Sequence, residues 1–354
     1  MATLARFTSR RMAEGTNTLS ALGGTAIVVA AALLAAAFIV ALLPSLTRYA
    51  LARPNARSSH RTPTPQGGGI AVVAATLAVV GVALTLTTVA SSASVSLPIV
   101  AAAIVVMTGL GAIDDVRPLP VTPRLVLQAV VVFAMLYAIP EQMRVIPALP
   151  WWLERCLLLI GGLWFVNLVN FMDGIDWMTV AEAVPLTATL AVIGFAGGLP
   201  AYATALSLGL GGAMIGFAYF NRPAARIFLG DVGSLPIGLM LGFLLLLVAG
   251  AGHLIAALLA PFYYLADATL TLLRRAARGE PILQAHRTHF YQRATDNGFT
   301  TMAIVARVFA VNIGLGILSV TTVLIPGPVT GIVALVAGTI LVTWLLVVFA
   351  QGKK

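Results

Sequence analysis

The sequence predicts an all-α polytopic membrane protein with about eleven transmembrane helices. Hydrophobic residues make up 60% of the 354-residue chain, and charged residues make up only 9%. Mean hydropathy is +1.00, a value typical of integral membrane proteins rather than of soluble domains. The apolar residues also fall into many separate runs that are each long enough to cross a bilayer.

A helix needs roughly 17 to 25 residues to cross the hydrocarbon core of a bilayer. Each span is predicted from an apolar run of about that length. A polar tail over 1–20 precedes a single integral-membrane catalytic domain over 21–349, and a short tail covers 350–354. The expected spans are 21–45, 68–90, 95–112, 123–140, 151–171, 179–197, 199–219, 232–250, 252–272, 301–325 and 328–349.

Arginine placement predicts the orientation of these spans. Loops after even-numbered spans contain only Arg144, and the positive-inside rule therefore makes the odd-numbered loops cytoplasmic. Lys353 and Lys354 fall on the same side, whereas the basic N-terminal tail conflicts with it; the more numerous loop charges decide the orientation. The arginines of the odd-numbered loops are Arg48, Arg53, Arg57, Arg61, Arg117, Arg222, Arg226, Arg274, Arg275, Arg278, Arg287 and Arg293.

Composition also excludes some partners and cross-links. The single cysteine, Cys156, rules out a disulfide framework within the chain. The formal net charge is +9, but there is no soluble basic domain to hold a nucleic acid, so no nucleic-acid partner is expected. The lipid bilayer is the expected environment.

Acidic residues follow the same loops as the arginines. Asp114 and Asp115, Asp173 and Asp176, and Asp231 all lie in or beside odd-numbered loops. Five carboxylates from three distant segments are therefore expected to meet at the cytoplasmic face, and we place the active site there.

The segment from Asn167 to Asp176 gives the clearest chemical signal. If it is helical to about Asp173, then Asn167, Asn170 and Asp173 lie on one face, and Gly174 lets the chain turn and bring Asp176 toward the same space. Oxygen ligands at a membrane surface suit a hard cation such as Mg²⁺. The alternative is a polar helix end without function.

The adjacent acids Asp114 and Asp115 end the third span. Two neighbouring carboxylates resist joint ionisation, so they favour a cation between them. Arg124 begins the fourth span and suits a lipid phosphate. The alternatives are a solvated acid pair and an arginine that only anchors the helix at the membrane surface.

Asp231 lies between two glycines, which permit close approach of the backbone to a ligand. It also precedes a helix, so an N-cap is the alternative. Phe228 could stack on a flat base. Farther along, His286, Arg287 and His289 form a dense donor cluster that suits a diphosphate; the alternative is a basic loop that binds anionic lipid. A zinc site is not favoured with so little sulfur.

These motifs together resemble one family. The set Pro63–Gly69, Asp114–Asp115, Asn167–Asp176, Phe228–Ser234 and His286–Gln292, in this order, resembles the polyprenyl-phosphate N-acetylhexosamine-1-phosphate transferases (the MraY and WecA type, glycosyltransferase family 4). The form His-Arg-Thr-His-Phe-Tyr-Gln is most similar to the bacterial branch that starts O-antigen or related surface glycans.

The resemblance implies a Mg²⁺-dependent enzyme, with Mn²⁺ as a possible substitute, that joins undecaprenyl phosphate and a UDP-N-acetyl sugar in the bacterial cytoplasmic membrane and releases UMP. A homodimer is a possible assembly. Asp231 would hold the metal with help from Asn170, and the catalytic set implied by the motifs is Asp114, Asp115, Asp231, His286, Arg287 and His289. The implied substrate-binding set is Arg124, Asn167, Asp173, Asp176, Asn221 and Phe228.

The implied roles differ within these sets. Arg124 and the acid pair match positions near the lipid phosphate, Phe228 matches the aromatic residue beside uracil, and Asp173 and Asp176 match the nucleotide region. The chain departs from the family at Trp177, where glycine is common, and after Asn221, where a second proline is more usual.

Two functions of other classes remain open. An ion-coupled transporter would need acids near the middle of the bilayer, and Asp267 is the only candidate there. A non-catalytic scaffold would not need so complete a set of phosphate and metal ligands.

Overall fold

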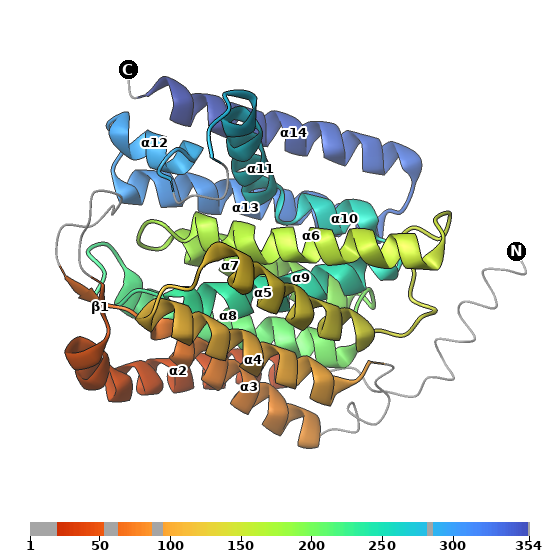
Figure 1. Ribbon diagram of the computed structural model, residues 1–354. Coiled ribbons are helices and arrows are strands. Elements are labelled where there is room, and N and C mark those ends of the chain that lie inside the picture. The colour runs from red at the N-terminus through yellow and green to blue at the C-terminus, as the bar shows by residue number, and fades with distance from the viewer. Residues whose placement is uncertain (1–19, 53–62, 87–94, 282–285, 353–354) are drawn as a thin grey trace, which may run out of the picture.

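The computed structural model describes residues 20–52, 63–86, 95–281 and 286–352. It is a bundle of long helices that lie side by side, with α11 lying steeply across the others (Figure 1). The helices are α2 (Ala21–Tyr49), α3 (Gly68–Thr85), α4 (Leu97–Val116), α5 (Val121–Tyr137), α6 (Trp151–Met172), α7 (Met178–Phe195), α8 (Ala201–Asn221), α9 (Asp231–Gly250), α10 (Leu254–Leu259), α11 (Phe262–Ala277), α12 (Phe290–Asp296), α13 (Thr301–Leu324) and α14 (Pro328–Gln351).

The predicted class, an all-α polytopic membrane protein, is confirmed. Among the described residues, nine helices are long and apolar enough to cross a membrane, and α5 is a shorter apolar helix. The predicted span over 252–272 is instead two helices, α10 and α11, which meet at Pro261. Proline has no N–H for the helical ladder and its ring clashes with the preceding turn, so the helix breaks there. The count of eleven spans stays a prediction.

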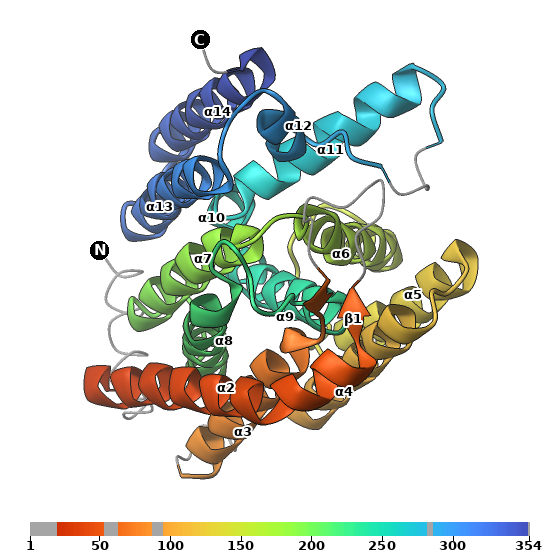
Figure 2. The ribbon, with the colours of Figure 1, turned by 90° about the vertical axis from the view of Figure 1, so that its left-hand side faces the viewer.

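α9 is the central helix of the bundle. It packs on α3, α4, α6, α7 and α10 (Figure 2). In its most hydrophobic 18-residue stretch, 89% of the residues are buried. Small residues let its neighbours come close: a Cβ on Gly69 would lie 2.1 Å from the Cα of Gly233, and a Cβ on Gly238 would lie 3.0 Å from the Cα of Val166. Such contacts between glycines and backbone are how membrane helices pack most tightly.

A short antiparallel sheet pins the start of α9. β1 (Leu51–Ala52) pairs with β2 (Thr64–Pro65), and the chain after β2 runs against Phe228 and Leu229. The amides of Gly67 and Gly68 donate to the Phe228 carbonyl, and that of Gly69 donates to the Leu229 carbonyl at 2.9 Å. The glycine-rich motif therefore fixes the strand-like segment that leads into α9, a structural role that explains its place beside the Asp231 motif.

The acid-bearing segments gather at one end of the bundle, at the left in Figure 1. This polar end, as we call it, consists of the segments 113–124, 170–179, 221–234 and 286–296 with β1 and β2. Contacts among these segments, described below, confirm the predicted convergence of distant acids. The N-terminal tail through residue 19, the arginines at 53, 57 and 61, and Lys353 and Lys354 lie outside the described residues, and the division into 1–20, 21–349 and 350–354 stays a prediction.

Candidate active site

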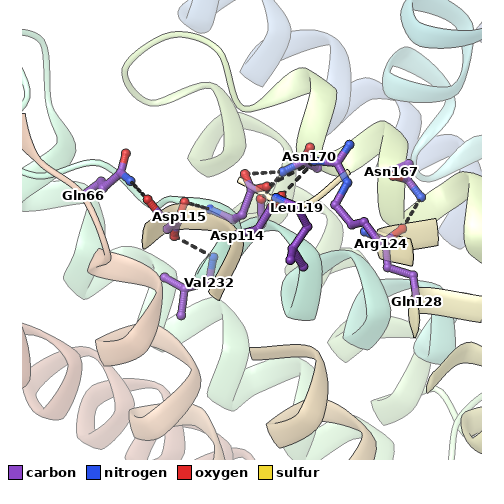
Figure 3. Close-up of polar contacts among 11 residues, drawn as sticks. Gln66, Asp114, Asp115, Leu119, Arg124, Gln128, Asn167, Asn170 and Val232 are labelled. Carbon is purple, nitrogen blue, oxygen red and sulfur yellow. Dashed lines mark hydrogen bonds and ion pairs between the residues drawn. The ribbon is translucent and has the colours of Figure 1, made fainter. Parts of the chain in front are cut away.

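Asp115 joins the end of α4 to the start of α9. Its two carboxylate oxygens accept the backbone N–H groups of Asp231, at 2.9 Å, and Val232, at 3.0 Å (Figure 3). A carboxylate at a helix N-terminus satisfies free amides and meets the positive end of the helix dipole. Gly230 has φ 74°, and a Cβ there would lie 2.5 Å from Asp115 Oδ2. Glycine is thus required on steric and conformational grounds, and Asp115 positions the helix that carries Asp231.

Asp114 points to the other side of the α4 end and holds Arg124. Its Oδ2 accepts from Arg124 Nη1 at 2.8 Å, and its Oδ1 accepts from the Leu119 amide at 2.6 Å. Arg124 Nη1 also lies 3.9 Å from Asp231 Oδ2. The Nε of Arg124 is buried and has no hydrogen-bond partner among the described residues. Arg124 therefore belongs to the carboxylate cluster and keeps a donor for a further anion.

Asn170, at the end of α6, meets Asp231 from the opposite side. Its Nδ2 donates to Asp231 Oδ1 at 2.7 Å and to Ser234 Oγ at 2.9 Å (Figure 3). The side chain of Asp231 is 28% exposed, so an incoming ligand can reach it. The Arg124 guanidinium lies 2.8 Å from Asp114 and 3.9 Å from Asp231. Asp115 adds a third carboxylate, which accepts the first amides of α9. This excess of negative charge suits a cation.

The chemistry of the donor set fits Mg²⁺ only if the substrate completes the coordination. No group of three or more His, Cys, Asp or Glu side chains able to hold a metal is found in the described ranges. Mg²⁺ in proteins is commonly held by one or two carboxylates together with substrate phosphates and water. Asp231 and the amide of Asn170 match that pattern.

Asn167 does not join the cluster, although it lies on the same helix. Its Nδ2 donates to Gln128 Oε1 and to the Leu163 carbonyl, both at 2.8 Å, and it is buried between α5 and α6 (Figure 3). The expected common face of Asn167, Asn170 and Asp173 is wrong in this respect, because the two asparagines face different neighbouring helices. Asn167 stabilises the α5–α6 packing.

Asp173 and Asp176 organise the loop that follows α6. The Thr179 hydroxyl donates to Asp173 Oδ1 at 2.5 Å, and the Ala225 amide donates to Asp176 Oδ2 at 3.0 Å. Desolvation and the charges of Asp115 and Asp176 raise the pKa of Asp173 to about 7, against the opposing effect of Thr179. Asp173 is thus partly protonated at neutral pH and repels an anionic ligand less than an ordinary aspartate.

Asn221 and Trp177 connect this loop to α8. Asn221 Oδ1 accepts from the Trp177 amide at 2.8 Å, and its Nδ2 donates to the Ile227 carbonyl at 2.9 Å. Trp177 has φ 64°, the left-handed region in which glycine is favoured. Its indole Nε1 donates to the Ala218 carbonyl at 2.6 Å. This contact with α8 stabilises tryptophan at a position where the backbone favours glycine.

The histidine motif is tied to α6 and α11. His289 is buried, and its Nδ1 lies 3.4 Å from Asp267 Oδ1. The Tyr291 hydroxyl donates to the Phe171 carbonyl at 3.0 Å, which places α12 beside the end of α6. A Cβ on Gly174 would lie 2.1 Å from that hydroxyl oxygen. The motif therefore forms another wall of the polar end.

His286 and Arg287, the other members of the donor cluster expected to bind a diphosphate, do not both contribute a free positive charge. Partial burial, with the nearby His289 and Arg275, lowers the pKa of His286 to about 4, so His286 is neutral at pH 7. Arg287 Nη2 donates to Thr295 Oγ1 at 2.9 Å and pairs with Asp296 at 3.2 Å. His286 can hydrogen-bond a diphosphate without adding charge, and Arg287 faces α12.

Asp267, the acid that the transporter alternative would have needed, has a structural role. It is fully buried, and its oxygens accept the backbone N–H groups of Phe290 and Tyr291 at 2.9 and 3.1 Å and the Tyr263 hydroxyl at 3.1 Å. Tyr263 and Thr271, each one turn away on the same helix, are the signal that this acid has local donors. Asp267 anchors α12, an arrangement that does not support the transporter alternative.

The chain is also similar in sequence to known proteins. Residues 97–249 match the profile of glycosyl transferase family 4. The decaprenyl-phosphate N-acetylglucosaminephosphotransferase of Mycobacterium leprae is 30% identical over 298 residues, which cover 73% of this chain and 73% of that protein. The probable undecaprenyl-phosphate N-acetylglucosaminyl 1-phosphate transferase of Bacillus subtilis is 28% identical over 40% of each chain. The phospho-N-acetylmuramoyl-pentapeptide-transferase of Chlamydia muridarum is 42% identical over 22% of this chain and 23% of its own.

Proposed function

This chain belongs to glycosyl transferase family 4, and from that premise we propose that it transfers an N-acetylated sugar-1-phosphate from a UDP-sugar to undecaprenyl phosphate. The products are an undecaprenyl-diphosphate sugar and UMP. The observation that carries the proposal is the position of Arg124, which lies between Asp114 and Asp231 and has a buried Nε that no described residue hydrogen-bonds. We assign the reaction to the first membrane step of O-antigen or another cell-envelope glycan.

The physical problem of this reaction is to bring two anions together. Arg124, held in place by Asp114, would receive the lipid phosphate. Asp231 and Asn170 would hold Mg²⁺, or Mn²⁺ in its place, which supplies positive charge to the diphosphate when bound. Asp115 would hold Asp231 in position because its carboxylate accepts the first backbone N–H groups of α9.

The acceptor needs no dedicated general base. A phosphate monoester has a second pKa near ~6, so the lipid phosphate is mostly dianionic at neutral pH. Its oxygen would attack the sugar-linked phosphorus, and the bond from that phosphorus to the UMP oxygen would break, with no net transfer of a proton. Both oxygens of Asp115 and both of Asp114 already accept hydrogen bonds, which favours positioning roles for the pair.

The nucleotide would occupy the loops beyond the carboxylate cluster. Phe228 lies three residues before Asp231 and would contact uracil, while Asp173 and Asp176 with Asn221 would shape the nucleotide pocket. His286 would hydrogen-bond the diphosphate, while His289 and Arg287 would hold its loop through Asp267 and α12.

An apolar cavity of about 290 Å³ offers space for the polyprenyl chain. It lies among α5, α6, α9, α10 and α11, and its walls include Phe165, Gly242, Leu258 and Leu265. Phe165 and Val166 of its lining stand about one helical turn before Asn170. The cavity would therefore hold isoprenoid units that follow a phosphate bound near Arg124.

The fate of the β-phosphorus tests the reaction. With UDP-sugar labelled at that phosphorus, we expect the label to enter the lipid fraction, because the attack is on phosphorus. A glycosyl transfer to lipid would leave the label in aqueous UDP, and a transporter would leave it in intact UDP-sugar. One extraction into organic solvent separates the first outcome from the other two, and chromatography of the aqueous phase distinguishes UDP from UDP-sugar. Label that stays wholly aqueous in active, Mg²⁺-containing membranes would contradict the proposal.

The arginine asymmetry motivates a proposal on orientation, in which the polar end faces the cytoplasm of a bacterial cell. In a Cys156→Ser background, a cysteine replacing Asp296 should be protected from an impermeant thiol reagent in intact cells and become reactive after lysis. A cysteine replacing Glu141, in an exposed loop between α5 and α6, should react in intact cells. The reverse labelling pattern would overturn the orientation.

A further inference from the structure

A polar pocket lies at the end of α11, beside the loop that carries the histidine motif. It has a volume of about 240 Å³. We call it the arginine pocket, and its lining consists of Thr271, Arg274, Arg275, Arg278, Glu280, Thr288 and Arg293. Residues 267, 271, 274, 275 and 278 follow helical spacing along α11, so one polar stripe of this helix first anchors α12 through Asp267 and then forms the wall of the pocket.

The arginine pocket has more positive charge than its own acid can balance. Four arginines face one glutamate, a net charge of +3. Glu280 pairs with Arg275 at 2.8 Å and reaches Arg278 only at 4.0 Å, while the guanidinium of Arg274 lies 4.5 Å from the Phe290 ring centroid. Like charges held together cost free energy unless an anion compensates them. Guanidinium groups match the geometry of phosphate oxygens, which they bind in pairs.

Arg275 is the most buried arginine of the pocket wall, so water screens its positive charge poorly. Its side chain is 11% exposed, and its Nη2 donates to the Pro281 carbonyl at 2.9 Å. Its Nε is buried without a hydrogen-bond partner among the described residues. A buried donor of this kind costs free energy unless a ligand or water satisfies it.

The pocket also lies at the edge of the apolar surface. Leu270 and Leu273, just before the arginines on α11, are 40% and 60% exposed, as expected for side chains that face lipid. Arginines at that boundary are at the depth of lipid headgroups. The phosphate of a membrane lipid is therefore within reach of the pocket.

The arginine pocket differs from the carboxylate cluster in position and in charge. Thr288 lines the pocket, whereas the ring of His289, the next residue, lies 6.4 Å from that of Phe171 on α6. The hydroxyl of Thr288 is 3.0 Å from His286 Nδ1. A ligand in the pocket would thus contact this loop through Thr288, whereas His289 of the same loop packs beside α6, the helix that also carries Asn170.

We propose that the arginine pocket is a separate binding site for a phosphate-bearing anion. Two sources have the required chemistry, the headgroup of an anionic phospholipid and soluble inorganic phosphate. The bound phosphate compensates the excess charge and steadies Thr288 and His286 from outside. The proposal concerns binding, and it stands independently of the reaction at the carboxylate cluster.

The test uses the full chain in nanodiscs of phosphatidylcholine to which phosphatidylglycerol is added stepwise, with binding followed by native mass spectrometry. The double variant Arg274→Gln/Arg278→Gln removes two pocket charges and keeps Arg275 with Glu280. An arginine that donates a charge-assisted hydrogen bond to the bound phosphate contributes roughly tenfold to its affinity, whereas an arginine outside the pocket makes no such contact. We therefore expect at least a fivefold weaker binding of phosphatidylglycerol by the double variant.

The matched control is Arg48→Gln/Arg222→Gln, which removes two exposed arginines that do not line the pocket. It should bind within twofold of the parent chain; an equal loss in both variants would reduce the effect to general surface charge and overturn the site. A second arm adds inorganic phosphate in pure phosphatidylcholine. Binding of phosphate that the pocket variant loses identifies the soluble source, and loss confined to phosphatidylglycerol identifies the lipid.

Two further results keep the test decisive. The pocket variant should unfold at the same temperature as the parent chain in phosphatidylcholine, since Arg278 is 72% exposed. If it does not fold, Arg274→Lys/Arg278→Lys replaces it, because lysine keeps the charge but loses the planar fork, and a weaker affinity for phosphate is again expected. Unchanged binding of both phosphatidylglycerol and phosphate in a folded variant would overturn the proposal.

Discussion

Asp231→Asn is expected to abolish turnover while the protein still inserts and folds. The amide of asparagine has the size of the carboxylate, so it preserves the fit beside Asn170 and Ser234. What it removes is a negative charge at the centre of the cluster. A metal-held diphosphate depends on that charge for several kcal/mol, and we therefore expect at least about a hundredfold loss in kcat.

The measurement is UMP release by purified protein across a Mg²⁺ titration, together with the unfolding temperature in detergent. Asp296→Asn is the matched control, because Asp296 is 59% exposed on α12 and pairs only with Arg287 among the ion pairs described. It removes an acid of the same type outside the cluster and should keep turnover within a few-fold. Near-normal UMP release by a folded Asp231→Asn variant would remove Asp231 from the site.

The acid pair shows how far sequence reasoning reached. Apolar runs and arginine placement predicted helices that bring Asp114 and Asp115 to the same end as Asp231, and the structure confirms this. The division of labour within the pair was not predictable. It depends on where the first amides of α9 lie relative to Asp115 and where Arg124 lies relative to Asp114, and both are tertiary contacts.

Two other residues have roles that also depend on tertiary contacts. Asn167 and Asn170 have equivalent positions in the motif, yet Asn167 faces Gln128 of α5 and Asn170 faces Asp231 of α9. Asp267 was the candidate acid for the transporter alternative. Its partners include backbone amides 23 and 24 residues farther along the chain, and no pattern of side chains reveals a backbone donor.

Gly111→Ala is expected to cause the largest loss of activity among changes that leave every polar group intact. Gly111 lies on α4, one turn before the acid pair, and packs directly on the start of α9. A Cβ there would lie 2.2 Å from the backbone oxygen of Asp231 and 2.6 Å from the Val232 nitrogen. These are backbone atoms that cannot rotate away, so α4 and α9 must separate.

Separation of the two helices acts on both functions of the acid pair. It lengthens the hydrogen bonds from the Asp231 and Val232 amides to Asp115, and it moves Arg124, held by Asp114, relative to Asp231. A displacement of about 1 Å in a catalytic arrangement can cost a hundredfold in rate, while overpacking in a core typically costs about 1–3 kcal/mol of stability. We expect both effects, with the loss of kcat the larger.

Gly109→Ala provides the control on the same helix. Outside its own helix turn, no atom of the described part of the chain lies within 4 Å of a Cβ at Gly109, so the substitution adds a methyl group to open space and slightly favours the helix. UMP release and unfolding temperature measured for both variants should separate them, with Gly109→Ala close to the parent chain. If Gly111→Ala retained parental kcat, the contact between α4 and α9 would not set the geometry of the acid cluster, and the role assigned to Asp115 would fail with it.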